Sequence, residues 1–368
     1  MVTVYDVAQR AGVSIATVSR ALNDRSRISA QTRQRVLAVA AELGYQPNDV
    51  ARSLVGKATQ TIALLLPDIA NPFFPELVKG VQTVADQRGH LLLLCPNADD
   101  EEKAISDLAL LRRKQVDGII LVTGALSGER FAPAAAGLPV VLMDRAIAVP
   151  HASLVAVDHR AGARLATEHL LALGHRRIAH LAGPANLPVT AERQAGWADA
   201  LRAAGVDPDD CPVLPGDFQE DGGWAAGRTL IGQRDRFTAV FAANDLSAIG
   251  LLAAFTDAGV RVPAEVSVVG FDGIHLSAYI TPKLTTVAQP IFELGQRAAE
   301  VLLDRIAGNA TPTDPIILTT TLIAGGSTAP PPGSTTTATP AGSTAPRPAT
   351  TAPSPADTPP VRPAATTT

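Results

Sequence analysis

Between residues 3 and 43 the apolar residues recur at spacings of three and four, which is the period of an α-helix. Glycines and capping residues divide this stretch into three short helices. Thr3 with Asp6 can form a capping box at the start of the first helix, and Ser14 and Ser29 can cap the second and third. The pattern therefore predicts a helix-turn-helix that a third helix closes into a small core.

The second predicted helix has an apolar and a polar face. Val18 and Leu22 point toward the small core. The outward positions near its start are Ile15, Ala16, Ser19 and Arg20. In a helix-turn-helix such positions reach base edges in the major groove, and an arginine such as Arg20 suits guanine. Any short three-helix bundle shows similar caps and stripes, so the pattern alone leaves a purely structural bundle open.

A further helix of about two turns is predicted between Asn48 and Gly56, after Pro47 has ended the preceding segment. Isolated helices shorter than ~12 residues are marginal in water, so we expect this one to order only when something pairs with it. Leu54 would then be an exposed apolar wedge, of the kind that kinks DNA from the minor groove. The alternative is a flexible linker with one exposed leucine.

From Thr61 onward, short β-branched or leucine-rich runs alternate with helical stretches. The strand-like runs lie at 62–66, 91–94, 118–122, 178–181, 239–241 and 266–269. The helical stretches lie at 76–88, 101–114, 161–173, 193–204 and 246–257. This βαβ rhythm predicts parallel sheets, and its restart after Val157 predicts two α/β halves.

Polar residues directly follow several strand-like runs: Asp68, Asp144, Asn244 and Asp272. Open α/β sheets bind ligands at the carboxyl ends of their strands. We therefore expect a ligand pocket built from these strand ends.

Charge separates the predicted head from the body. Residues 1–60 carry eight Lys and Arg against four Asp and Glu, whereas the whole chain has a net charge of −4, which leaves −8 for the remainder. A basic head on an acidic body fits a nucleic-acid partner for the head.

Several function classes are not supported by the sequence. No apolar run reaches about 18 residues and the start lacks a secretory pattern, which predicts a cytoplasmic protein. Cys95 and Cys211 lie far apart without metal-ligand spacing, so we expect core thiols and no metal or other cofactor. From Gly325 the chain is rich in Thr, Pro, Ala and Ser, which predicts a disordered solvated tail rather than a glycosylated stalk.

Catalytic motifs do not stand out either. Gly56-Lys57 is followed by Ala58 and lacks the upstream glycine of a phosphate-binding loop. No Gly-x-Ser-x-Gly elbow is present, and the seven histidines show no metal-ligand spacing. We therefore do not expect an enzyme.

Longer strings of residues resemble the LacI/GalR family of repressors. In the head these are Asp6-Val7-Ala8, Ala11-Gly12-Val13-Ser14, Thr17 to Asn23 and Leu43-Gly44-Tyr45-Gln46-Pro47-Asn48. In the rest of the chain they are Ala51 to Leu54, Asn71-Pro72-Phe73-Phe74, Met143-Asp144-Arg145, Gly174-His175, Leu181-Ala182-Gly183, Ala243-Asn244-Asp245 and Val269-Gly270-Phe271-Asp272. The resemblance covers residues 2 to about 327.

The resemblance implies an α/β protein with an N-terminal all-α helix-turn-helix head and a two-subdomain periplasmic-binding-protein-like body with parallel sheets. It implies a DNA-binding domain at 1–47, a hinge helix and linker at 48–60, an effector-binding and dimerisation domain at 61–327, and a tail at 328–368. The expected partners are a palindromic double-stranded operator, a second copy of the chain in a homodimer, and a small effector, most simply a sugar or sugar derivative. The expected function is a transcriptional regulator, with repression the commoner mode.

Operator contacts carried over from the family are Thr3, Ser14, Ile15, Ala16, Ser19, Arg20, Asn23, Tyr45, Asn48, Ala51 and Leu54. Neither Ile15 nor Ala16 can hydrogen-bond a base through its side chain, so readout there must be apolar or by shape.

Effector contacts carried over in the same way are Phe73, Asp144, Arg145, Arg193, Phe218, Asn244 and Asp272. Arginine and carboxylates suit hydroxyl groups, and an aromatic ring, here Phe218, can cover the apolar face of a sugar. Structural alternatives remain: Phe73 as plain core, Arg145 in an ion pair, Asp272 in a turn and Asn244 as a helix cap. Trp197 and Trp224 are expected to pack rather than to stack on a ligand.

Two other functional interpretations stay open. A regulator of the same build could respond to a nucleobase or another metabolite, or to no ligand. A sugar-binding protein without DNA-binding activity would share the body but would have no use for the head.

Overall fold

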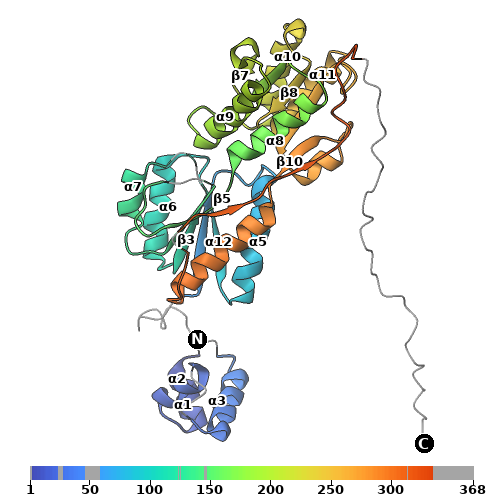
Figure 1. Cartoon of the computed structure of the whole chain (residues 1–368). Coiled ribbons are helices and arrows are strands. Elements are labelled where there is room, and N and C mark those ends of the chain that lie inside the picture. The colour runs from blue at the N-terminus through green and yellow to red at the C-terminus, as the bar shows by residue number, and fades with distance from the viewer. Residues whose placement is uncertain are drawn as a thin grey trace, which may run out of the picture. The chain divides into compact units, whose positions relative to one another are not determined.

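The computed structural model describes residues 2–23, 28–45, 59–122, 124, 126–144, 147–312 and 314–334, except for the side chain of Asn23. Figure 1 shows a helical head, residues 2–45, and an α/β body, residues 59–334. Among the described residues no helix is long and apolar enough to cross a membrane.

The head is the predicted helix-turn-helix with its third helix. Its elements are α1 (Val4–Ala11), α2 (Ile15–Asn23) and α3 (Ala30–Glu42). They enclose a core of small apolar side chains: Val7, Ala8, Ala11, Val18, Ala21, Val36 and Ala40. Leu22 is only partly buried against this core.

The predicted capping residues of the head act as caps. The backbone N–H of Thr3 donates to the Asp6 carboxylate at 2.7 Å. Ser14 and Ser29 accept from the N–H groups three residues ahead at 3.1 and 3.2 Å. Gly12 takes the left-handed conformation, with φ of 65°, which ends α1 and allows the tight turn.

The body contains two six-stranded sheets, each in a separate lobe. The first lobe has strands β1 (Thr61–Leu66), β2 (Leu91–Pro96), β3 (Gly118–Leu121), β4 (Val140–Met143), β5 (Ser153–Val157) and β11 (Ile316–Leu318). The second lobe has β6 (Ile178–Leu181), β7 (Val213–Leu214), β8 (Ala239–Ala242), β9 (Ser267–Asp272), β10 (Thr285–Ala288) and β12 (Thr321–Ile323). Their spatial orders are β11-β5-β4-β3-β1-β2 and β12-β10-β9-β8-β6-β7.

All neighbouring strands run parallel except β12, which is antiparallel to β10. The predicted parallel sheets and the two halves are therefore confirmed. The central strands are buried on both faces, which explains their continuous apolar runs.

Helices cover both faces of each sheet. In the first lobe, α5 (Phe73–Gln87) and α12 (Ile291–Ile306) pack on one face, and α6 (Glu101–Arg113) and α7 (Gly128–Ala134) on the other (Figure 1). In the second lobe, α10 (Glu220–Ile231) and α11 (Asp245–Asp257) pack opposite α8 (His159–Ala172) and α9 (Pro188–Ala203). The short 3-10 turns are η1 (Pro208–Asp210), η2 (Arg234–Arg236) and η3 (His275–Ala278).

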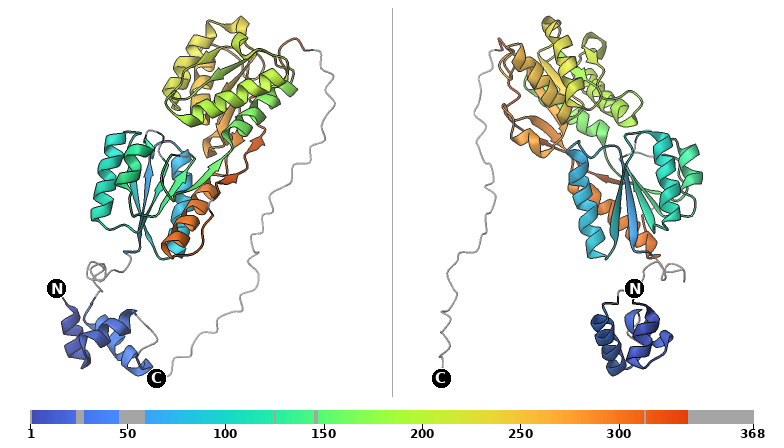
Figure 2. Two further views of the ribbon diagram at one scale, coloured as in Figure 1. Left: turned by 60° about the vertical axis from the view of Figure 1, so that its left-hand side comes forward. Right: turned by 180° about the vertical axis from the view of Figure 1, so that it is seen from behind.

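The lobes do not correspond to two continuous halves of the sequence. The chain crosses between β5 and α8, returns between β10 and α12, and crosses again between β11 and β12 (Figure 2). The expectation of a simple restart after Val157 is therefore incomplete, because α12 and β11 follow the second lobe in sequence and pack in the first.

The second lobe extends past the predicted boundary at residue 327. The N–H of Ala329 donates to Ser267 Oγ at 3.0 Å, and the Thr328 hydroxyl lies 3.0 Å from His169 Nε2. The Ser327 hydroxyl donates to the carbonyl of Val268 at 2.6 Å. The start of the predicted tail is thus part of the second lobe, and residues 335–368 lie outside the described residues.

Candidate effector pocket and DNA-reading surface

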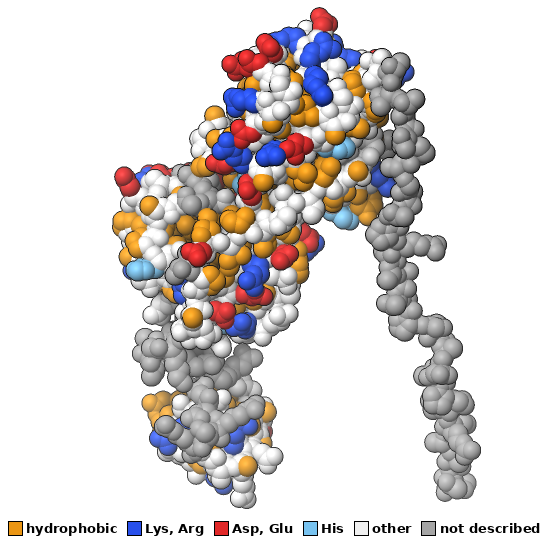
Figure 3. Space-filling view, in the orientation of Figure 1, with side chains coloured by type: hydrophobic (Ala, Val, Ile, Leu, Met, Phe, Trp, Pro, Cys, Tyr) orange, Lys and Arg blue, Asp and Glu red, His pale blue; other side chains and the backbone are white. Residues whose placement is uncertain are grey.

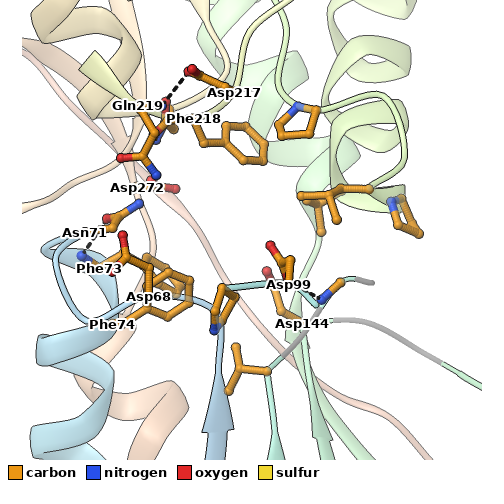
Figure 4. A pocket seen from close by; sticks show the side chains of 18 of the residues that line it. Asp68, Asn71, Phe73, Phe74, Asp99, Asp144, Asp217, Phe218, Gln219 and Asp272 are labelled. Atoms are coloured by element: carbon orange, nitrogen blue, oxygen red, sulfur yellow. Dashed lines mark hydrogen bonds between the residues drawn. The ribbon is translucent and has the colours of Figure 1, made fainter. Parts of the chain in front are cut away.

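A cavity of about 350 Å³ lies between the two lobes, at the carboxyl ends of their parallel strands. All four strand-end residues singled out from the sequence line it, namely Asp68, Asp144, Asn244 and Asp272. Figure 4 shows the side chains of Asp68, Asp144 and Asp272 around the cavity, together with those of other residues from both lobes. A volume of this size suits a small ligand.

Aromatic rings form two walls of this pocket. Phe73 and Phe74, at the start of α5, lie edge to face with ring centroids 5.2 Å apart. Phe218 faces them from the second lobe (Figure 4). A Cβ atom added at Gly183 would come within 2.2 Å of the Phe218 ring, so that glycine makes room for the ring. Phe73 is also a buried member of the first lobe's core, so the residue both packs in the core and lines the pocket.

Carboxylates surround the pocket. Asp68, Asp99 and Asp217 each accept a backbone N–H with one oxygen, from Ala70, Gly124 and Gln219 at 2.8 to 3.2 Å. Asp144 and Asp272 complete a set of five carboxylates, whereas Arg193 is the one Lys or Arg among the described lining residues. The pocket is therefore electronegative.

Asp144 and Arg193 are joined by a buried histidine. His159 Nε2 lies 2.6 Å from the Asp144 carboxylate, and Arg193 Nε donates to His159 Nδ1 at 3.3 Å. Since Nδ1 accepts from the guanidinium, Nε2 carries the proton and donates to Asp144. Asp144 follows β4 of the first lobe and His159 begins α8 of the second, so the hydrogen bond between them connects the two lobes.

Arg193 is held on every side. Its Nη1 donates to the carbonyl of Ala243 at 2.5 Å and lies 3.4 Å from the Asp272 carboxylate. The guanidinium carbon lies 4.0 Å from the centre of the Phe271 ring, a cation–π geometry. Many other ion pairs are exposed, and side chains of both signs mix on the surface of the second lobe (Figure 3), whereas the Arg193 and Asp272 side chains are only 5% and 7% exposed.

The buried carboxylates differ in their pKa values because their partners differ. Burial alone would raise the pKa of Asp144, but His159 and Arg193 hold it below its ordinary value. Burial and the nearby Asp144 raise the pKa of Asp272 to about 6, against the opposing effects of Arg193 and Gln289. Behind them, burial and Asp272 raise the pKa of Asp245 to about 7.

Asn244 acts as a helix cap. Its Oδ1 accepts from the N–H of Ser247 at 3.1 Å at the start of α11, and its Nδ2 donates to the carbonyl of Phe218 at 2.9 Å. The capping interpretation is therefore confirmed, although the residue also lines the pocket. Through Phe218, the cap also positions an aromatic wall.

The other residues considered from the sequence do not line the pocket in the described part of the chain. Arg145 lies outside the described residues. Trp197 is buried and donates to the carbonyl of Ile178, and Trp224 donates to Asp257, so neither lines the pocket. Cys211 is buried and Cys95 half-buried, both without a disulfide. Among the described residues no group of acidic, His or Cys side chains could hold a metal ion.

Sequence reasoning missed several residues at this site. His159 and Gln289, whose Nε2 donates to Asp272 at 2.8 Å, act behind the lining residues. Asn71, Asp99 and Asp217 line the pocket itself. The two aspartates follow turns after strands or strand-like runs, the same signal that singled out Asp68, and could have been found with it.

In the head, the predicted recognition positions are exposed. Ile15, Ala16, Ser19 and Arg20 all lie on the outer face of α2. Thr3 and Ser14 are also exposed, although both act as caps, and Tyr45 is half-buried against the core of the head. The side chain of Asn23, and Asn48, Ala51 and Leu54 with the predicted hinge helix, lie outside the described residues.

A helix-turn-helix head on a two-lobed α/β body with a pocket between its lobes defines a class of ligand-responsive DNA-binding regulators. Residues 3–48 match the profile of bacterial regulatory proteins of the lacI family, and residues 167–328 match a periplasmic binding protein-like domain. The chain is 40% identical to the ribose operon repressor of Halalkalibacterium halodurans over 83% of its own length and 91% of the relative's. The chain belongs to the LacI family of transcriptional regulators, as its motifs indicated.

Other relatives agree with this assignment. The chain is 36% identical to the transcriptional repressor CytR of Escherichia coli strain K12, over 83% of this chain and 90% of that one. A lac repressor dimer bound to operator and the anti-inducer ONPF superposes with a TM-score of 0.80 at 32% identity, over 89% and 99% of the two chains. A LacI family regulator from Enterococcus faecium with bound ribose gives 0.69 at 37% identity, over 73% and 99%. The expected fold class is therefore confirmed, and these curated relatives are regulators rather than enzymes.

Proposed function

We propose that this chain is a repressor that binds a palindromic operator as a homodimer and responds to an uncharged sugar in the pocket between its lobes. The observation that carries the proposal is the electronegative, aromatic-walled pocket on the same chain as an exposed recognition face. As a DNA-binding repressor it would act in the cytoplasm, and we assign it no catalytic role.

The chemistry of the pocket supports a sugar without a phosphate group. Phe73, Phe74 and Phe218 can cover the apolar faces of a sugar ring, and carboxylate oxygens accept hydrogen bonds from hydroxyl groups. An anionic ligand would meet five carboxylates, and Arg193 is already engaged by Asp272, Ala243 and His159. Ribose is the first candidate, because the ribose operon repressor is among the relatives and ribose occupies a similar structure.

A nucleobase or nucleoside is the second candidate. The chain is 35% identical to a repressor named PurR and 36% identical to CytR, and the same phenylalanine rings could stack on a planar base. A nucleobase offers fewer hydroxyl donors to the carboxylates than a sugar does, which is why the sugar is preferred.

DNA recognition is assigned to the exposed face of α2. Arg20 and Ser19 can hydrogen-bond base edges or phosphates, whereas Ile15 and Ala16 offer only apolar contact. From the sequence, Leu54 is proposed to enter the minor groove at the centre of the operator. Thr3, Ser14, Asn23, Tyr45, Asn48 and Ala51 complete the proposed interface.

The test is a fluorescence titration at fixed salt of the full-length protein with a duplex that the wild type selects from a palindromic library. It is repeated with ribose, xylulose, cellobiose, adenine, cytidine and ribose 5-phosphate. We expect tight binding that one uncharged sugar shifts and the phosphate does not. Selection of no duplex would refute the DNA-binding part, and a shift by adenine or cytidine alone would favour the second candidate.

Two variants separate the head from the pocket. Leu54→Ala is expected to weaken operator binding and leave sugar binding unchanged. Asp272→Ala, with the milder Asp272→Asn, is expected to abolish the response to sugar and keep DNA binding, whereas the exposed Asp209→Ala serves as a control. An Asp272 variant that still responds to sugar contradicts the proposed pocket.

A further inference from the structure

The chain enters the first lobe through a clamp made by one carboxylate. Asp117 Oδ1 accepts the N–H of Thr59 at 2.8 Å, and its Oδ2 accepts the N–H of Thr61 at 3.1 Å. The hydroxyl of Thr59 donates to the carbonyl of Gln115 at 2.8 Å. Thr59 is the first residue of the body that the structure describes, so the clamp holds the described start of this lobe.

The clamp holds an unfavourable backbone conformation. Gln60 lies between the two bonded N–H groups and has a φ of 53°, in the left-handed region that non-glycine residues rarely adopt. Its carbonyl accepts the N–H of Leu91 at 2.7 Å, which ties the same bend to the start of β2. The direction in which the chain leaves the lobe is thus fixed by Asp117.

Two adjacent strands connect the clamp to the effector pocket. β1 begins at Thr61 and β3 begins directly after Asp117, and the two strands pair in parallel in the interior of the sheet. Six residues of β1 span roughly 20 Å at about 3.3 Å per residue. At their far ends, Asp68 follows β1 and Val122 follows β3, and both line the pocket. Buried, hydrogen-bonded strands of this kind move as a rigid unit.

We propose that Asp117 is a positioning residue for regulation. Its carboxylate fixes the root of the segment that leads to the head, so that a displacement of the first lobe on ligand binding reaches the DNA-binding helices. This inference rests on the proposed function. Without the clamp the chain would pivot at Thr59, and the pocket and the head would act independently.

The test compares full-length Asp117→Asn and Thr59→Val with the control Asp107→Asn. Asparagine has the size of aspartate, but its side chain has one acceptor oxygen and cannot accept both N–H groups. Asp107 lies on α6 of the same lobe and pairs with Lys103 at the surface, away from the clamp. Three quantities are measured: operator affinity on the duplex that the wild type selects, ribose affinity by calorimetry, and the melting temperature.

We expect Asp117→Asn to weaken operator binding roughly tenfold, because the heads lose their fixed orientation. The ratio of operator affinities with and without ribose, typically 5–150-fold for such coupling, should fall below about threefold. Ribose affinity should change less than about twofold, since the pocket lies at the other end of the strands. Thr59→Val should show the same pattern more weakly, and Asp107→Asn none of it.

Three other results would overturn the inference, and each can be told from the expected one. Operator affinity and sugar response equal to those of Asp107→Asn would show that the clamp transmits nothing. A large fall in melting temperature together with lost ribose binding would show a purely structural role. If ribose does not shift the wild type, operator affinity alone decides, and a wild type that selects no duplex refutes the proposed function before any variant is compared.

Discussion

The head and the pocket present their proposed binding residues in opposite ways. In the head, Ile15, Ala16, Ser19 and Arg20 come from one helix and are exposed. In the pocket, Arg193, Asn244 and Asp272 come from separate elements. Each is at most 5% exposed as a whole residue and is bonded to other buried groups. The recognition face can thus change without affecting the fold, whereas these pocket residues also connect separate elements of the second lobe.

Arg193→Met is the strongest test of this difference. Methionine fills similar space, but Asp272 and His159 lose the guanidinium, and removing one member of a buried pair costs about 3–5 kcal/mol. Urea unfolding at pH 7.5 should show this loss, and the loss should be smaller at pH 5.5, because Asp272, with its pKa raised to about 6, takes up a proton there. Arg164→Met, which removes an exposed pair with Glu168, is the matched control and should leave the unfolding free energy nearly unchanged. Equal losses in both variants would remove the distinction between buried and exposed charges.

The next largest expected effect is the acid destabilisation of the body through a buried histidine of the second lobe. His180 stacks between Trp197 and Phe241, its Nδ1 donates to the carbonyl of Phe241, and burial lowers its pKa to about 4. The unfolded chain binds this proton near pH 6.5, so the stabilisation is present above that pH and is lost as pH falls toward 4, by about 3 kcal/mol.

The measurement is the difference in unfolding free energy between the wild type and His180→Phe from pH 7 to pH 4. The variant should show the shallower decline, since phenylalanine keeps the stack and binds no proton. Replacement of the exposed His275 by glutamine controls for the loss of a histidine elsewhere. Parallel curves for wild type and His180→Phe would mean that His180 takes up its proton as readily in the folded protein as in the unfolded chain.

The sequence predicted the structure of the head more completely than that of the body. The head was predicted almost completely, because its caps, glycines and apolar spacing are local. In the body, strand-like runs gave six strands, but β4, β5, β7, β10, β11 and β12 were missed. Three of these six, β7, β11 and β12, lie at sheet edges and are short and partly exposed. The start of α5 at Phe73 and of α9 at Pro188 also came earlier than the periodicity indicated.

The sequence predicted several residues that line the pocket. It did not predict the buried residues that hold those side chains in place. Strand-end position singled out Asp144 and Asp272, since parallel strands end at one edge. Nothing local distinguishes His159 or Gln289, because each acquires its role from a residue that only the tertiary fold brings near. The resemblance located Arg193 correctly in the pocket but not its engagement by Ala243 and Asp272.

Helix caps allow the two regions to be compared with one chemistry. Ser29 caps α3 on the exposed surface of the head, and Asn244 caps α11 beside the pocket while holding the Phe218 carbonyl. Ser29→Ala should cost about 1 kcal/mol, and Asn244→Ala about 2 kcal/mol because a buried carbonyl also loses its donor. Asn244→Asp keeps an acceptor for the cap, but it replaces the donor to the Phe218 carbonyl with a charged oxygen in a buried site, so this variant should lose ribose affinity as well as stability. If Asn244→Ala costs no more than Ser29→Ala, the buried carbonyl has found another donor.

The smallest expected effect on stability lies on the outer face of α2. Arg20→Ala removes an exposed side chain whose described surroundings include no ion pair, so unfolding free energy should change by under about 0.5 kcal/mol. Operator affinity should nevertheless fall by roughly tenfold or more per half-site, since a bidentate contact to guanine is worth about 1–3 kcal/mol. A salt titration identifies the type of contact: an arginine that binds only phosphate changes the slope of affinity against salt and weakens all sequences alike, whereas one that reads a base relaxes specificity at one position. If Arg20→Ala destabilises the head as much as the cap variants do, the recognition face is part of the fold after all, and the contrast with the pocket is one of degree.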